Sequence, residues 1–144
     1  MSDPICQLME DIEGLCKRCY HLQKSNNEMY GKKTSYFLII LNFHLLVFFL
    51  SFKDYLHEDK QMQDYIDENE KIIEKYHRKI NEICQLIKEN NQQQTDSSHW
   101  SPIALDYKKM EEEEKRSCQE KKKKFYDQQQ QQQDNHSEDK GVYL

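Results

Sequence analysis

Turn-forming residues are scarce in this chain, which has three glycines and two prolines among 144 residues. A compact domain of this length normally needs more of both, because its chain reverses direction often. Apolar residues make up 36% of the sequence and charged residues 33%, which disfavours a large globular core. The composition therefore predicts an all-α protein with elongated helices and few turns.

A surface of one charge sign is also missing. The net charge of −5 arises from 26 acidic and 21 basic residues, and both signs occur along the whole chain. Nucleic-acid binding usually requires a concentrated basic surface that displaces counterions. Only the short run Lys121 to Lys124 has this character, so we expect no specific nucleic-acid binding.

The sequence has neither a disulfide framework nor a motif for catalysis. Its five cysteines are an odd number with irregular spacing, which indicates reduced thiols in the cytosol or nucleus. There is no glycine-rich phosphate loop, and none of the six histidines stands in a known nucleophile motif. We therefore expect no enzyme, no catalytic residue, no cofactor and no small-molecule substrate.

Cys16 and Cys19 form a C-x-x-C pair, a spacing that can hold zinc or act as a redox pair. Zinc would need two further ligands, and only Cys6 and His21 lie nearby in the sequence. A redox pair normally sits in a βαβ unit, which the pattern does not offer. The favoured interpretation is structural, with Cys19 in a core position and no metal bound.

Two other groups with ligand chemistry are interpreted as solvent-facing. His77 falls at the e position of a heptad, where exposure is the default. The acidic run Glu111 to Glu114 precedes Lys115 and Arg116, which predicts i,i+4 pairs on a solvated helix rather than a metal site.

An amphipathic helix is predicted in residues 1–31. Asp3 is a suitable N-cap and Pro4 suits the first turn, where its missing N–H is not needed. Gly31 is the expected end of the helix. Apolar residues then recur with alternating spacings of three and four, at Ile5, Leu8, Ile12, Leu15, Cys19 and Leu22.

Residues 53–93 have the clearest pattern, a heptad repeat that predicts a coiled coil. Three more apolar residues, Tyr65, Ile72 and Leu86, take the g position and widen the stripe toward a bundle of three or four helices. The residues expected to form the interaction seam with partner helices are Met62, Ile66, Asn69, Ile73, Tyr76, Ile80, Ile83 and Ile87.

The segment 32–52 contains an apolar run from Tyr36 to Phe52, near the lower length limit for crossing a bilayer core of about 30 Å. Lys32 and Lys33 before it favour a cytoplasmic N-terminus if it spans a membrane. Three interpretations stay open, namely a membrane span, a buried core helix and an insertion foreign to the fold.

The C-terminal third is polar. Residues 94–102 are predicted to be a linker, and residues 103–127 a charged helix with a thin apolar face at Ile103, Tyr107 and Met110. A polyglutamine tract, Gln128 to Gln133, opens a tail (128–144) that is predicted to be disordered.

One stretch, Ile80-Asn81-Glu82-Ile83-Cys84-Gln85-Leu86-Ile87-Lys88-Glu89-Asn90, resembles a helical run of a vertebrate synaptonemal-complex central-element protein. Trp100-Ser101-Pro102, before a charged helix, is similar to a W-x-P feature of the same family. The resemblance implies a nuclear, chromosome-associated meiotic scaffold that assembles with other helical proteins and has no catalytic residues.

Two functions follow from these patterns. The first is a structural coiled-coil interaction protein that binds helical partners or a second copy of itself, as a synaptonemal-complex scaffold would. The alternative is a small single-pass membrane protein that is anchored through residues 36–52 and displays a coiled coil.

Overall fold

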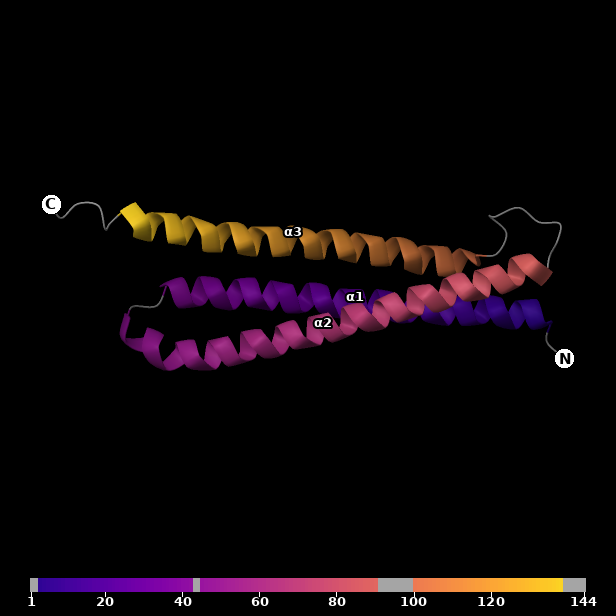
Figure 1. Ribbon diagram of the computed structural model, residues 1–144, viewed down its shortest axis with the longest axis horizontal. Helices are drawn as coiled ribbons and strands as arrows, with labels where there is room; N and C mark the ends of the chain where they lie inside the picture. Colours follow the sequence, from indigo (N-terminus) through magenta and orange to yellow (C-terminus); the bar gives the residue numbers. More distant parts are fainter. Residues whose placement is uncertain (1–2, 43–44, 91–99, 139–144) are drawn as a thin grey trace.

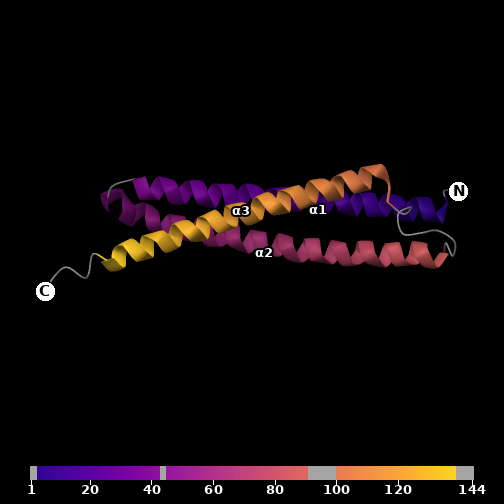
Figure 2. The same cartoon turned by 90° about the horizontal axis from the view of Figure 1, so that it is seen from above.

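The computed structural model describes residues 3–42, 45–90 and 100–138. They form three long helices, α1 (Pro4–Asn42), α2 (Leu45–Asn90) and α3 (Pro102–Glu138). The helices lie lengthwise beside one another, with α1 and α3 running in the same direction and α2 running back (Figure 1, Figure 2). Within the described residues no strand occurs, which confirms the all-α prediction.

Two helices begin at an X-Pro pair whose first residue caps the helix. The Asp3 Oδ1 atom accepts a hydrogen bond of 3.1 Å from the Ile5 backbone N–H. The Ser101 Oγ atom accepts one of 3.1 Å from the Ala104 backbone N–H. The following prolines occupy the first helical position, where no N–H donor is required. The predicted start of the N-terminal helix is therefore confirmed.

The predicted end of that helix at Gly31 is wrong, because α1 continues to Asn42. No glycine among the described residues has a positive φ angle, so Gly31 stays helical. Its neighbours Tyr30 and Lys33 are buried by the other helices. This packing outweighs the roughly 1 kcal/mol by which glycine disfavours a helix interior.

The apolar run from residue 36 to residue 52 is divided between two helices. Its first part ends α1 and its last part begins α2, while residues 43 and 44 lie outside the described chain. Among the described residues, no helix has the length and apolar character that a membrane crossing requires. The side chains of residues 36–55 are not among those that the structure describes, so the core and insertion interpretations stay predictions.

The C-terminal helix is longer than predicted. Instead of ending at residue 127, α3 continues through the polyglutamine tract Gln128–Gln133 to Glu138. Disorder is therefore not confirmed for residues 128–138. The predictions for residues 94–99 of the linker and 139–144 of the tail fall outside the described residues.

α1 is the central helix of the bundle, because it packs against both α2 and α3. Within the described ranges, no Cα atom of α2 lies within 8 Å of a Cα atom of α3. The main apolar cluster brings Ile12 and Leu15 of α1 together with Ile83 and Ile87 of α2 and Ala104 of α3. A smaller cluster joins Tyr30, Ile66 and Cys118.

The predicted seam of α2 is filled by α1 of the same chain. Three of its residues, Met62, Asn69 and Tyr76, are half-buried. The seam residues that are buried outright are Ile66, Ile73, Ile80, Ile83 and Ile87. Assembly of this seam with helices of another chain stays a prediction.

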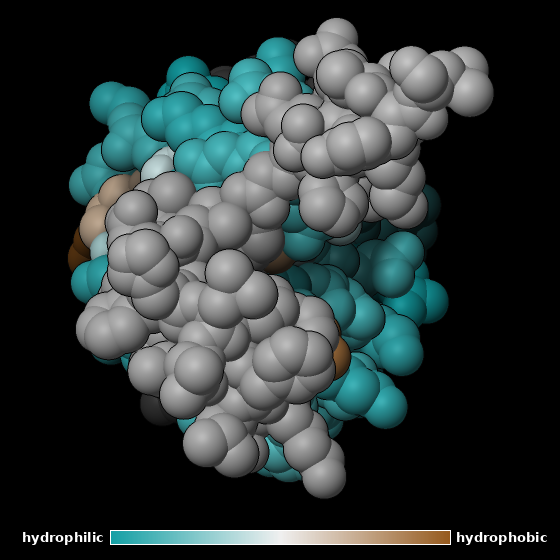
Figure 3. All heavy atoms as spheres, turned by 90° about the vertical axis from the view of Figure 1, so that its left-hand side faces the viewer, coloured by the Kyte–Doolittle hydropathy of each residue, from teal (hydrophilic) through white to brown (hydrophobic). Residues whose placement is uncertain are grey.

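The buried face of α3 differs from the predicted one. Ile103 is 52% exposed and Met110 is 37% exposed, whereas Tyr107 is half-buried. The buried residues instead recur every seven positions, at Ala104, Glu111, Cys118 and Phe125. Seen from the end where α1 meets α2, the coloured surface is mostly hydrophilic (Figure 3).

Candidate functional site at the three-helix junction

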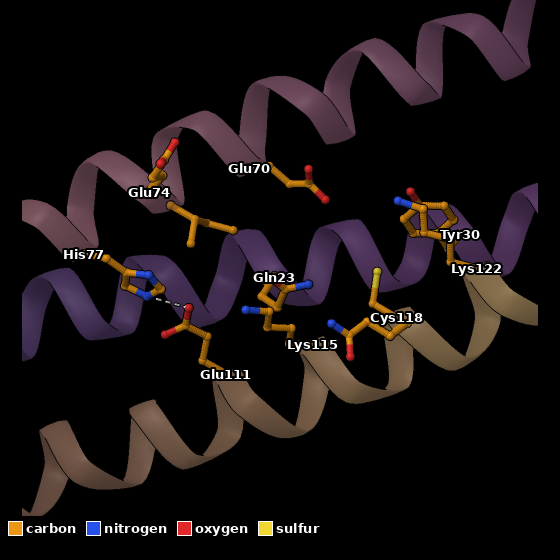
Figure 4. A pocket seen from close by; sticks show the side chains of 11 residues that line it. Gln23, Tyr30, Glu70, Glu74, His77, Glu111, Lys115, Cys118 and Lys122 are labelled. Carbon is orange, nitrogen blue, oxygen red and sulfur yellow. Dashed lines mark ion pairs between the residues drawn. The ribbon is translucent and has the colours of Figure 1, made fainter.

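A thiol, an imidazole and a carboxylate meet where the three helices come together. Cys19 belongs to α1, His77 to α2 and Glu111 to α3, and their ligand-capable atoms all lie within 4.8 Å of one another. The His77 Nε2 atom is 2.8 Å from the Glu111 Oε1 atom, and this ion pair joins α2 to α3 (Figure 4). These residues are the ones that could hold a metal ion.

The junction is buried on one side and open to solvent on the other. Cys19 is fully buried and the Glu111 side chain is 9% exposed, whereas the His77 side chain is 46% exposed. His77 and Glu111 line two cavities, of about 390 Å³ and about 320 Å³, that lie on either side of their ion pair. Small molecules or ions can therefore reach the imidazole and the carboxylate without unfolding the bundle.

Burial shifts the titration of the acidic groups toward their neutral forms. Desolvation, with a further contribution from the nearby Glu111 carboxylate, raises the pKa of Cys16 to about 11 and that of Cys19 to about 12. Desolvation also raises the pKa of Glu111, and the neighbouring His77 partly opposes this. Since these thiols are protonated near neutral pH, they are not activated nucleophiles, and only an added cation would hold Cys19 as a thiolate.

Next to the junction along α1, Asn26 and Asn27 form hydrogen bonds to the other two helices. The Asn69 Nδ2 atom donates a hydrogen bond of 2.8 Å to the Asn26 Oδ1 atom, and Asn26 is fully buried. On the other side of α1, Asn27 donates to a carboxylate oxygen of Glu114 and accepts a hydrogen bond of 3.3 Å from the Ser117 hydroxyl. Polar side chains therefore connect α1 to both of its neighbours.

Lys33 forms the next layer, although it is only 4% exposed. Its Nζ atom donates a hydrogen bond of 2.9 Å to the Gln63 side chain and lies 3.3 Å from the Asp59 Oδ1 atom. The same ammonium lies 5.4 Å from the centre of the Phe125 ring, a cation–π distance. The buried lysine therefore forms an ion pair with Asp59 of α2 and a cation–π contact with Phe125 of α3.

One side of α2 carries apolar residues that the described part of the chain leaves partly or largely exposed. We define the side strip as Tyr65, Ile72 and Leu86, of which Tyr65 is 55% and Leu86 is 48% exposed, while Ile72 is half-buried. Three other residues of α2, Glu70, Glu74 and His77, line a cavity between α2 and α3 and therefore face α3. They flank the seam on one side, and the side strip flanks it on the other. The side strip thus points away from α3.

The junction differs from what the sequence indicated. Cys19 is buried, at 0% exposure, as the structural interpretation expected, and Cys16, expected beside the seam, is buried as well, at 2%. The two extra ligands considered for zinc, Cys6 and His21, are exposed and do not belong to the cluster. His77 and Glu111 join it instead.

The interpretation of Glu111 as solvent-facing is wrong, because α3 turns this residue inward with Ala104 and Cys118. These positions are seven residues apart, but their side chains differ too much in hydropathy for the spacing to show in the sequence. His77 is exposed as expected, yet its e position lies beside α3, so it reaches Glu111. Comparison of the chain with protein-family models, with curated proteins and with solved structures finds no match.

Proposed function

We propose that this chain is a structural interaction protein, in which the side strip of α2 pairs with the same strip of a second copy. The observation that carries the proposal is the exposure of Tyr65 and Leu86 beside a seam whose isoleucines Ile66, Ile73, Ile80, Ile83 and Ile87 are buried. Apolar residues that recur on one exposed side of a helix are typical of protein interaction surfaces. Because α1 fills the seam, the side strip is the part of the heptad pattern left for a partner.

Charges beside the strip favour a second copy in the antiparallel orientation. Lys79 stands seven residues after Ile72 at the same heptad position, and Glu68 lies one turn before Ile72; both are exposed. If two strips pair antiparallel about the point midway between Ile72 and Lys79, Tyr65 of one copy lies opposite Leu86 of the other. Lys79 then lies within a helical turn of Glu68 on the other copy, and the two opposite charges attract.

The first test uses sedimentation velocity on the full chain over a range of concentrations. We expect a concentration-dependent dimer that is lost in Leu86→Glu, because this change places an unpaired carboxylate against Tyr65 of the other copy. The variants Glu68→Lys and Lys79→Glu should each weaken dimerisation, and the double variant should restore it.

Glu74→Lys is the matched control, since Glu74 is exposed on the side of α2 that faces α3. This variant should dimerise as the wild type does. A monomeric wild type at every concentration would exclude pairing between copies. Equal weakening by Glu74→Lys would place the interface on another face of α2.

The resemblance of residues 80–90 and of Trp100-Ser101-Pro102 to the synaptonemal-complex protein supports a nuclear, meiotic scaffold as the setting of this assembly. In the structure, Trp100 packs against the main apolar cluster and lies 4.8 Å from the Lys108 ammonium. Antibody staining of meiotic nuclei should therefore give signal along paired chromosomes. Signal confined to another compartment would separate the assembly from chromosome synapsis.

A further inference from the structure

The three helices of the bundle contribute one metal-ligating side chain each to a single point. We propose that Cys19, His77 and Glu111 bind one zinc ion, which joins α2 and α3 to α1. The three ligand-capable atoms lie within 4.8 Å of one another. Zinc–ligand distances of about 2.0–2.3 Å place the ligands of a tetrahedral site roughly 3.3–3.8 Å apart. A shift of about an ångström in flexible side chains therefore completes the site.

The chemistry of the three donors favours zinc over the hard cations. Magnesium and calcium select oxygen ligands, whereas a thiolate and an imidazole suit zinc. The charges also balance, because one thiolate and one carboxylate neutralise a divalent ion while the imidazole stays neutral. Adding Cys16 as a second thiolate would leave a net negative charge in a buried place, so we assign the fourth position to a water molecule.

A bound cation would further stabilise the buried carboxylate at the junction. Glu111 is the charged member of the heptad set that also contains Ala104, Cys118 and Phe125, and it is 7% exposed. A carboxylate in this position is costly unless it is paired, and its partner His77 is half open to solvent. The open side gives the metal a path to two of the three ligands, since His77 and Glu111 line both adjoining cavities.

A metal at this point would change how the bundle is held together. Within the described ranges, α2 and α3 have no Cα atoms within 8 Å of each other. One zinc ion bound by a residue of each helix would fix their separation and stabilise the folded chain, because the site exists only when all three helices are in place.

The test measures zinc binding to the purified full chain, made metal-free with a chelator and kept reduced. Isothermal titration should give one zinc per chain, and cobalt in its place should show a thiolate-to-metal charge-transfer band and tetrahedral d–d absorption. Cys19→Ser, His77→Gln and Glu111→Gln should each weaken zinc binding by about 100-fold or more, since even the loss of a residue that only orients a ligand costs about 10–100-fold.

Cys16→Ser and Cys118→Ser are the matched controls, because both remove a buried thiol of the same bundle. They should bind zinc within about threefold of the wild type. Glu111→Gln separates binding from folding, since it removes a buried charge and should keep wild-type helicity by circular dichroism while losing zinc. A wild type that binds no zinc would overturn the proposal, and so would a Cys16→Ser loss as large as that of Cys19→Ser.

Discussion

Replacing Ile12 with alanine tests whether α1 is the helix around which the bundle is built. Ile12 is fully buried, at 0% exposure, in the cluster that contains Leu15, Ile80 and Ile83. Loss of a buried isoleucine side chain costs about 2–5 kcal/mol, because a cavity adds to the lost burial. In a slender bundle the cavity can partly collapse, so we expect a loss of about 3 kcal/mol.

The measurement is urea unfolding followed by circular dichroism at the helix band. With an m value of about 2 kcal/mol/M, a loss of about 3 kcal/mol lowers the urea midpoint by roughly 1.5 M. Ile103→Ala is the control, because it makes the same chemical change at a side chain that is 52% exposed. It should cost less than about 0.5 kcal/mol. If Ile103→Ala destabilises as much as Ile12→Ala, the core does not lie around α1.

Two further predictions concern Asn69 and Cys118. Asn69→Ala should cost about 1–3 kcal/mol in the same assay, because the buried Asn26 side chain loses its hydrogen-bond partner. Replacing both Asn26 and Asn69 with leucine should be neutral or stabilising. An Asn69→Ala variant as stable as the wild type would contradict the pairing. Burial raises the pKa of Cys118 from 9.0 to about 11, so its stabilising contribution is fully present below pH 9 and is lost as the pH rises through 11. The free energy of unfolding of the wild type should therefore fall more steeply between pH 9 and pH 11 than that of Cys118→Ala, and parallel curves would show that the thiol is not buried.

The features that the sequence predicted are those fixed by neighbouring residues. The cap at Asp3 depends on a side chain two residues before its hydrogen-bond donor. The stripe of α2 could be predicted because isoleucine recurs at Ile66, Ile73, Ile80 and Ile87, and a β-branched residue repeated at heptad spacing is typical of the seam between packed helices.

The features that the sequence missed depend on a third helix. The buried face of α3 contains Ala104, Glu111, Cys118 and Phe125, a set so mixed in hydropathy that no apolar stripe is visible. The exposure of His77 at its e position was expected, but its ion pair with Glu111 depends on where α3 packs. The site therefore could not be inferred from any single helix.

The buried polar residues explain why α1 and α2 align in one register. The isoleucines of α2 repeat every seven residues, so a slip by one heptad would bury the same apolar groups. The same slip would place Asn26 opposite Met62 or Tyr76 instead of Asn69, its hydrogen-bond partner at 2.8 Å. Each asparagine left unpaired costs about 1–3 kcal/mol. Lys33 would also lose the Asp59 carboxylate, which lies 3.3 Å away. Apolar contacts therefore hold the two helices together, while the asparagine pair and the buried lysine select a single alignment, the one in which Cys19, His77 and Glu111 meet.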